Sequence, residues 1–217
     1  PDFQPAAETC SWATIIIFEE NEPPVLVPRA VKVPENSKMG SLVGQPVVGT
    51  DPDGDALTYY MVGGNLAGQF YINNKTAQIS TLDSNGLDFE RRSTYTVIIE
   101  AVDSGAGNLS TAVPISIFVT DVNEPPSMKD FLIEVDENLP MGMPVGVVYG
   151  IDEDAEDTLS YFFVGPDNNK IPATIDDRLR VDETTGELIM SSNGFNFELK
   201  NKYLYSLIAI DAKGLRS

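Results

Sequence analysis

The residues of this chain that could do chemistry are its carboxylates. Asp and Glu total 33 against 14 Lys and Arg, which gives a formal net charge of −19. The chain has no histidine, and Cys10 is its only cysteine. Imidazole catalysis, His-ligated zinc or iron, an internal disulfide and a cysteine-zinc cluster are therefore excluded. This acidic excess repels nucleic acid and anionic lipid, so the carboxylates must be solvated, neutralised by cations or arranged around metal.

Five short motifs recur in the same order, about 100 residues apart. The matched pairs are Asn21-Glu22-Pro23-Pro24 with Asn123-Glu124-Pro125-Pro126, Pro34-Glu35-Asn36 with Asp136-Glu137-Asn138, Asp51-Pro52-Asp53 with Asp152-Glu153-Asp154, Leu87-Asp88-Phe89-Glu90 with Phe195-Asn196-Phe197-Glu198, and Ala101-Val102-Asp103 with Ala209-Ile210-Asp211. Repetition at a fixed spacing indicates an array of one structural unit.

The segments between these motifs are typical of β-strands. Residues 95–99 and 112–119 are rich in β-branched and aromatic side chains, and residues 203–209 repeat this composition. Gly and Pro punctuate the chain at short intervals as turn residues. No long segment carries the 3.6-residue apolar period of a helix. Each unit is therefore predicted to be a β-sandwich of about seven strands and about 100 residues.

The chain has room for two such units and a short additional segment. We place the units at residues 21–122 and 123–217, within a total of 217 residues. Residues 1–20 are interpreted as the last strand of a preceding, truncated repeat, because residues 13–18 resemble residues 115–119. No apolar run is long enough to cross a bilayer, and no signal peptide is recognised. We therefore interpret the chain as an internal fragment whose signal or membrane anchor lies outside it.

The acidic motifs fall at predicted strand ends and turns. Strand ends of a sandwich gather at its two poles, so these carboxylates are expected to converge there. The set at one pole is Glu35, Asp88, Glu90 and Asp121, and the set at the facing pole of the next unit is Asp152, Asp154 and Asp211.

Carboxylates gathered in this way need cations. Two like charges 4 Å apart repel by about 4 kcal/mol at an effective dielectric constant of about 20. Ca²⁺ accepts about six to eight oxygen ligands in flexible geometry, whereas Mg²⁺ retains water and demands a near-ideal octahedron. Carboxylates in this number are suited to sharing about two or three calcium ions.

At these motifs the chain resembles the extracellular repeats of the cadherin superfamily. Those repeats carry an X-Glu-X motif near the first strand, Asp-X-Asp in mid-repeat, Asp-X-Glu, a later Ala-X-Asp and an Asp-X-Asn-Asp-Asn linker. This chain shows all five in order over residues 19–217. The resemblance implies an all-β fold of two tandem seven-stranded Greek-key β-sandwiches, plus the fragment of a preceding repeat.

The resemblance also implies a set of calcium ligands around residues 121–124. Two ions would be held by Glu35, Asp88, Glu90, Asp121, Glu124 and the Val122 carbonyl, with Asp154 reaching across from the second repeat. A third would be held by the Asn123 side chain, the Pro125 carbonyl, Asp152, Asp154 and Asp211. The linker departs from the family where Glu124 replaces Asp and Pro125 replaces Asn. Glu124 adds one methylene of reach, and Pro125 keeps the carbonyl that the family uses.

The other two junctions are incomplete. The upstream junction is expected to hold one ion, with a ligand set of Glu19, Asn21, Glu22, Asp51, Asp53 and Asp103. At the far end of the chain the matched residues are Glu137, Asn196 and Glu198. Asn196 stands where the first unit has Asp88, so a weaker or differently loaded site is expected there.

Three other interpretations of the acidic motifs are weaker. Residues 51–55 are also typical of an acidic turn, and an EF-hand there would have Val62 in place of its last Glu and no flanking helices. Asp88 and Glu90 could form the acid and base of a glycosidase, but no aromatic sugar-binding cluster accompanies them. We expect no enzyme activity.

The resemblance implies a calcium-dependent cell-adhesion or extracellular tether module, in which Ca²⁺ at the linker rigidifies a rod. The alternative is a ligand- or carbohydrate-binding surface repeat that acts as a receptor or spacer. The expected partner is another cadherin or cell-surface protein, bound homophilically or heterophilically, and the expected location is the extracellular side of a membrane protein. The sequons that begin at Asn74 and Asn108 are compatible with a glycosylated eukaryotic surface.

Overall fold

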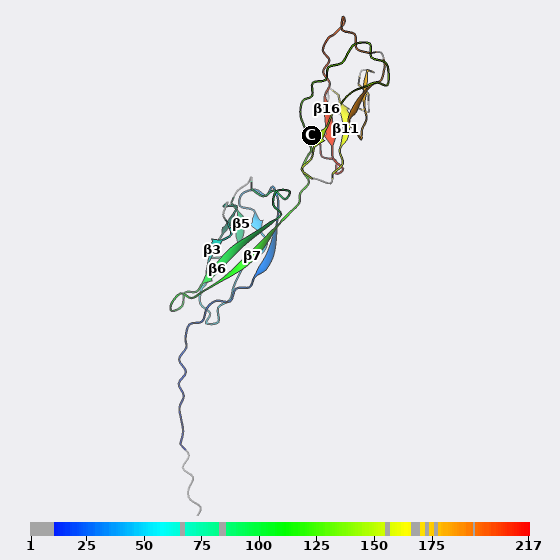
Figure 1. The fold of residues 1–217 in the computed structure, drawn as a ribbon. Helices are drawn as coiled ribbons and strands as arrows, with labels where there is room; N and C mark the ends of the chain where they lie inside the picture. Colours follow the sequence, from blue (N-terminus) through cyan, green and yellow to red (C-terminus); the bar gives the residue numbers. More distant parts are fainter. Residues whose placement is uncertain are drawn as a thin grey trace, which may run out of the picture. The chain divides into compact units, whose positions relative to one another are not determined.

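The protein is built from β-strands. A computed structural model describes residues 11–65, 68–82, 86–154, 157–165, 170–171, 174–175, 178–192 and 194–217. Within these ranges every regular element is a strand (Figure 1), and no helix is present that could cross a membrane. The chain forms two compact units. The first comprises Pro1–Asp88 and Arg92–Thr120, and the second comprises Phe89–Arg91 and Asp121–Ser217. The repeat boundaries that we placed from the sequence stay a prediction, and Cys10 lies outside the described residues.

The first unit contains a four-stranded and a three-stranded sheet among its described residues. Its strands are β1 (Arg29–Pro34), β2 (Leu42–Val43), β3 (Thr58–Gly63), β4 (Phe70–Ile72), β5 (Ile79–Thr81), β6 (Thr94–Val102) and β7 (Ser110–Thr120). The larger sheet has the order β1-β7-β6-β3 and the smaller one β2-β5-β4. β1 pairs with β7 in parallel, whereas β7 with β6 and β6 with β3 are antiparallel (Figure 1).

Alternation along β6 and β7 builds the core of the first unit. On β6 the side chains of Tyr95, Val97 and Ile99 are buried, while the residues between them are exposed. On β7, which pairs with β6 in register, Ile115 and Ile117 are buried in the same way. This period of two places one face of the sheet in the core and leaves the strand ends at the poles of the unit.

Ile99 and Ile98 provide a direct test of these two faces. Ile99 is fully buried, whereas Ile98 is 40% exposed. We expect Ile99→Ala to lower the free energy of unfolding by about 2–5 kcal/mol, because it removes buried methyl groups and leaves a cavity. Ile98→Ala is expected to cost less than about 1 kcal/mol. Urea denaturation followed by circular dichroism measures both, and equal losses would contradict the assignment of the faces.

The second unit has shorter strands. Those described are β8 (Ser127–Met128), β9 (Pro144–Val147), β10 (Gly150–Ile151), β11 (Ser160–Val164), β12 (Lys170–Ile171), β13 (Thr174–Ile175), β14 (Leu179–Val181), β15 (Glu187–Met190) and β16 (Leu207–Ile210). They form sheets of order β10-β8, β12-β11-β16 and β13-β14-β15-β9. Phe163, Met190 and Ala209 are buried at the centre of the core. Asp152 directly follows β10, and Asp211 directly follows β16.

The all-β sandwich fold is confirmed, and residues 95–99 and 112–119 lie within β6 and β7. The strand expected at 203–209 is wrong in its first half, since β16 begins at Leu207. There Tyr203 packs on Phe195, and Tyr205 packs on Phe163. These tyrosine rings pack against other aromatic rings, although the backbone of residues 203–206 forms no strand.

Residues 11–20 are described and form no strand. Their apolar side chains are exposed, including Trp12 at 96% and Ile17 at 89%. A strand needs a neighbouring strand to satisfy its N–H and C=O groups. The interpretation of this segment as the last strand of a preceding repeat stays a prediction.

Candidate metal centre

Two tight turns position the acidic residues at one pole of the first unit. Asp51 accepts hydrogen bonds at Oδ1 from the backbone N–H groups of Asp53 and Asp55, at 3.0 and 3.2 Å. Asp103 follows β6 and accepts two more at Oδ1, from Gly105 at 3.1 Å and Leu109 at 3.0 Å. Asp side chains stabilise turns in this way. Each carboxylate is thereby held in place and keeps its second oxygen for other partners.

The linker before the first unit is bound to these turns. Asn21 donates from Nδ2 to Asp103 Oδ2 at 3.1 Å. The backbone N–H of Glu22 donates to Asp53 Oδ2 at 2.8 Å. The structure thus brings together four of the predicted upstream ligands, Asn21, Asp51, Asp53 and Asp103. Glu19 is exposed on the linker.

The second unit repeats this linker arrangement at the matched residues. Asn123 donates from Nδ2 to Asp211 Oδ2 at 2.6 Å, and the N–H of Glu124 donates to Asp154 Oδ2 at 3.0 Å. The N–H of Asp154 donates to Asp152 Oδ1 at 3.0 Å. The correspondence between the units therefore extends from sequence motifs to individual hydrogen bonds. Val122 and Pro125, whose carbonyls were predicted ligands, lie exposed on either side of Asn123 and Glu124.

A left-handed turn places Glu35 beside the end of β1. Asn36 has a φ of +52°, and the matched Asn138 has a φ of +60°. Asn tolerates this conformation better than most residues. The N–H of Asn36 donates to the Leu87 carbonyl at 3.1 Å, which joins this turn to the residue before Asp88. Glu35 itself is only 3% exposed.

The carboxylates gather in three groups, in each of which one oxygen per residue lies within 4.8 Å of the others. The groups are Glu35 with Asp88 and Glu90, Glu90 with Asp121 and Asp154, and Asp152 with Asp157 and Asp211. All the carboxylates that the sequence assigns to the two poles are members. The second and third groups lie wholly in the second unit. Asp157 is the one member that was not predicted from the sequence.

Buried oxygens without hydrogen-bond partners test whether these groups suit a metal ion. Such atoms include Asp51 Oδ2, Asn123 Oδ1, Asp152 Oδ2 and Asp154 Oδ1. Leaving a polar atom buried and unsatisfied costs about 1–3 kcal/mol, and more when the group is charged. All four atoms are hard oxygen donors, and their residues are among the predicted ligands. The donor set therefore fits Ca²⁺, which binds carboxylate and amide oxygens.

The charges in the third group oppose one another. Burial raises the pKa of Asp152, and the nearby charges of Asp154, Asp157 and Asp211 raise it further, although the Asp154 N–H lowers it. Desolvation also acts to raise the pKa of Asp211. The hydrogen bonds from Asn123 and from backbone N–H groups outweigh it and hold this pKa below the usual value. A cation placed here would relieve the repulsion at Asp152.

One basic side chain reaches this group. Lys213 Nζ lies 3.6 Å from Asp157 Oδ2. Desolvation lowers the pKa of Lys213, but the charges of Asp157, Asp154 and Asp121 outweigh it and raise the pKa above the usual value. The lysine is therefore a charged counter-ion at the edge of the acidic group.

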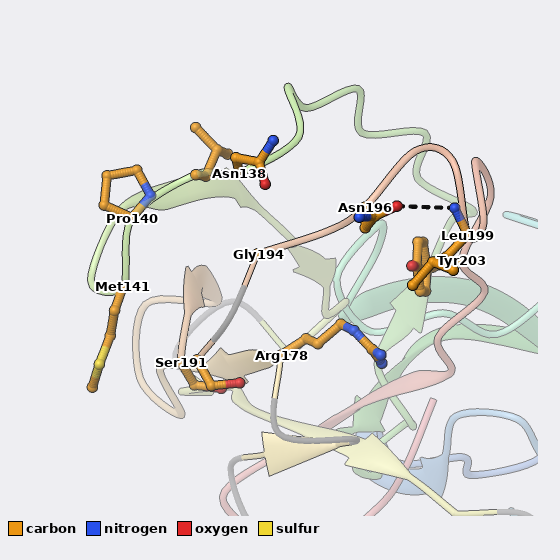
Figure 2. Close-up of a pocket in the computed structure, with 11 residues that line it drawn as sticks. Asn138, Pro140, Met141, Arg178, Ser191, Gly194, Asn196, Leu199 and Tyr203 are labelled. Carbon is orange, nitrogen blue, oxygen red and sulfur yellow. Dashed lines mark hydrogen bonds between the residues drawn. The ribbon is translucent and has the colours of Figure 1, made fainter.

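A separate hollow of about 700 Å³ lies in the second unit (Figure 2). It is lined in part by Asn138 and Asn196, the residues matched to Asn36 and Asp88 of the first unit. Asn196 Oδ1 accepts a hydrogen bond from the Leu199 N–H at 2.9 Å, drawn in Figure 2. Arg178 also lines the hollow, beside Tyr203. The weaker far-end site expected from the sequence stays a prediction.

Comparisons with known proteins agree with this geometry. A family model described as the cadherin domain matches residues 29–120. Protocadherin-16 of Mus musculus is 36% identical over 126 residues, which cover 56% of this chain and 4% of that protein. Protocadherin Fat 1 of Homo sapiens is 31% identical over 213 residues, which cover 92% of this chain and 4% of that protein. The chain thus spans a small part of the length of these relatives.

A solved structure matches both units. The crystal structure of human protocadherin-24 EC1-2, form II, is 26% identical with a TM-score of 0.67, and the match covers 90% of this chain and 89% of that one. The family model, the relatives and this structure point to one family of extracellular adhesion domains, which are not enzymes. Repeats of this family bind Ca²⁺ at their junctions, and the acidic groups described above have the donors for it. The chain belongs to the cadherin superfamily.

Proposed function

We propose that this chain is a calcium-dependent adhesion or tether module, in which Ca²⁺ at the linker of residues 121–125 rigidifies the two repeats into a rod. The observation that carries the proposal is the set of buried oxygens without hydrogen-bond partners on Asn123, Asp152 and Asp154. They lie where the linker is bound to the second unit, and a divalent cation would satisfy them. The membership of the cadherin superfamily supports the same function.

The proposed ion content is about three calcium ions at this junction and one at the upstream linker. The first two would use Glu35, Asp88, Glu90, Asp121, Glu124 and the Val122 carbonyl, and the third the Asn123 side chain, the Pro125 carbonyl, Asp152, Asp154 and Asp211. The upstream ion would use Asn21, Asp51, Asp53 and Asp103. Three of these four upstream residues are acids: N–H groups of their own turns donate to Asp51 and Asp103, and the Glu22 N–H of the linker donates to Asp53.

Small-angle X-ray scattering tests the rigidifying role. With calcium at about 2 mM, which exceeds or matches the dissociation constants of about 10⁻⁴–10⁻³ M that are common in extracellular modules, we expect an extended particle with a single maximum dimension. With a chelator we expect a broader distribution of dimensions, while circular dichroism still reports folded β-sheet. Identical scattering under both conditions would contradict the proposal.

A second experiment separates adhesion from ligand binding. Beads coated with this chain should aggregate in calcium and disperse in chelator if the repeats bind a like copy. Aggregation only with beads that carry a different cell-surface protein would indicate a heterophilic partner. The parent protein is proposed to act at the cell surface, as the extracellular part of a membrane protein.

A further inference from the structure

The larger sheet of the first unit carries apolar side chains on the face that points away from the core. Tyr60, Val62 and Ile98 are 48%, 53% and 40% exposed. Pro114 is exposed as well, and it pairs with Ile98 in the ladder between β6 and β7. On a sheet with one solvated face, that face normally carries polar residues. We call these four residues the outer patch, and contiguous exposed apolar side chains of this kind mark interaction sites.

A β-bulge brings the side chains of the outer patch together. The register of β3 against β6 shifts between Met61 and Gly63, so that Val62 is the extra residue and Gly63 pairs with Ile98. The Ile98 side chain lies over this bulge, because a Cβ added at Gly63 would be 3.1 Å from Ile98 Cδ1. Tyr60 is exposed on β3 two residues before Val62. The outer patch therefore runs without a break from β3 across β6 to β7, which lie side by side in Figure 1.

The matched position of the second unit is covered. Tyr60 pairs with Glu100, and Phe162 pairs with Ile208. Glu100 and Ile208 directly precede the matched Ala-X-Asp motifs, so Phe162 corresponds to Tyr60. Phe162 is only 4% exposed, against 48% for Tyr60. The open patch is therefore particular to the first unit and does not follow from the repeat alone.

The face that holds the outer patch is almost without charge. In the paired parts of β1, β3, β6 and β7, its outward positions hold one base, Lys32, and one acid, Glu100. Glu100 Oε1 accepts a hydrogen bond from Ser110 Oγ at 2.8 Å. The whole chain has a formal net charge of −19. Two copies of so acidic a chain can meet through a neutral face without strong repulsion, whereas a basic partner would bind better to the acidic poles.

The edges of this sheet direct a partner to its face. β3 and β1 are its edge strands, and β3 carries the bulge while β1 ends in Pro34. Bulges and prolines oppose the addition of another strand at an edge. A second sheet can instead pack face to face, as the sheets of a β-sandwich do.

The size of the face suits a weak dimer. Four strands about 4.8 Å apart, and the nine residue pairs of the β6–β7 ladder at about 3.3 Å each, span about 19 by 30 Å. Each copy thus offers roughly 600 Å², against about 800 Å² per partner in a stable interface of standard size. An area somewhat below the standard size is typical of weak, reversible complexes.

We propose that the outer patch is the contact surface for a second copy of this chain, which docks through its own outer patch. This inference rests on the adhesive function proposed above and names the surface and the partner. A symmetric dimer uses the same patch on both copies, so every apolar side chain of the patch is buried twice. Burial of Val62, Ile98 and Pro114 supplies the hydrophobic driving force, and Tyr60 adds a large ring whose hydroxyl can still form hydrogen bonds.

Sedimentation equilibrium of the complete chain in calcium tests the proposal at concentrations from about 1 µM to about 1 mM, the affinity range of weak complexes. We expect the wild type to pass from monomer to dimer. Ile98→Glu brings two like charges together at the centre of the contact and is expected to weaken the dimer at least about tenfold. Tyr60→Ser removes a buried ring and is expected to weaken it about tenfold.

The matched controls lie on the smaller sheet of the same unit. Leu42→Glu is the control for Ile98→Glu, and Tyr71→Ser is the control for Tyr60→Ser. Leu42 is 66% exposed and Tyr71 is 52% exposed, so both substitutions change a solvent-facing side chain of the same kind. Both variants are expected to dimerise like the wild type.

The outcomes separate this inference from the function on which it rests. A wild type that stays monomeric over the whole range refutes the contact, while calcium-dependent scattering would still support the rigidifying role. Equal dimerisation of Ile98→Glu and Leu42→Glu also refutes the contact. Loss of the dimer in the patch variants alone supports it, even if calcium leaves the scattering unchanged. Circular dichroism shows whether each variant is folded, and Tyr60→Ser with its control decides the question if Ile98→Glu is unfolded.

Discussion

Asp154→Ala is expected to weaken calcium binding at the second unit by about 100-fold or more. Asp154 joins Glu90 and Asp121 in one carboxylate group and contributes to the electrostatic field at Asp152 in the next. Its Oδ1 is buried without a hydrogen-bond partner, and its Oδ2 accepts the Glu124 N–H that binds the linker. One substitution therefore removes a shared ligand and a linker contact together.

A series of variants separates these two contributions. Asp154→Asn keeps an oxygen that can accept the Glu124 N–H but loses the charge, so its calcium affinity should fall while its melting temperature in chelator stays near that of the wild type. Asp154→Ala should also lose about 1 kcal/mol in chelator, since the hydrogen bond is gone. Glu153→Ala changes the adjacent exposed residue and serves as the control. Equal calcium affinity in Asp154→Ala and Glu153→Ala would exclude Asp154 as a ligand.

Removal of calcium is expected to lower the melting temperature of the wild-type chain by about 10 °C or more. Calcium at about 2 mM is about 20 times a dissociation constant of about 10⁻⁴ M, and it then stabilises the folded state by about 1.8 kcal/mol per site, so that two or three sites together contribute about 4–5 kcal/mol. A loss of 1 kcal/mol shifts the melting temperature of a domain of this size by roughly 4–8 °C. The physical cause is the return of repulsion between carboxylates such as Asp152 and Asp211, which no longer share a cation.

Differential scanning calorimetry in calcium and in chelator measures this shift. Magnesium at the same concentration is the matched control, and it should restore little of the loss, because it retains its water and demands an octahedron of ligands. Sodium chloride at equal ionic strength separates specific binding from screening. Full recovery in magnesium or in sodium chloride would contradict a calcium-specific site.

Much of the acidic architecture could be predicted from the amino-acid sequence. Asp51, Asp103 and their matches follow strands or fill turns, and alternating apolar residues such as those of β6 define where the strands end. Because strand ends gather at the poles of a sandwich, local patterns suffice to place these acids near one another. The carboxylates assigned to the two poles do gather in groups.

Asp157 was not predicted from the sequence, because the two units differ in length just before it. The second unit has one residue more than the first between its Asp-X-Asp motif and the strand that follows, so alignment on Asp53 and Asp154 does not pair Asp55 with Asp157. The hydroxyls of Tyr59 and Tyr161, which accept hydrogen bonds from the N–H groups of Gly49 and Gly150, lie four residues after the two aspartates and restore the match, and these bonds are tertiary contacts. A search that aligned the tyrosines as well as the acids would have found the pair.

The sequence by itself determined the repeat, the acidic motifs, the lack of histidine and the oxygen chemistry that these residues allow. Only the tertiary structure decided which oxygens are buried without partners and which acid Lys213 neutralises. The Asn123 to Asp211 hydrogen bond joins residues 88 positions apart, and no local pattern encodes such a contact. Burial and distance set the electrostatic energy of a carboxylate, and both arise from packing between distant segments.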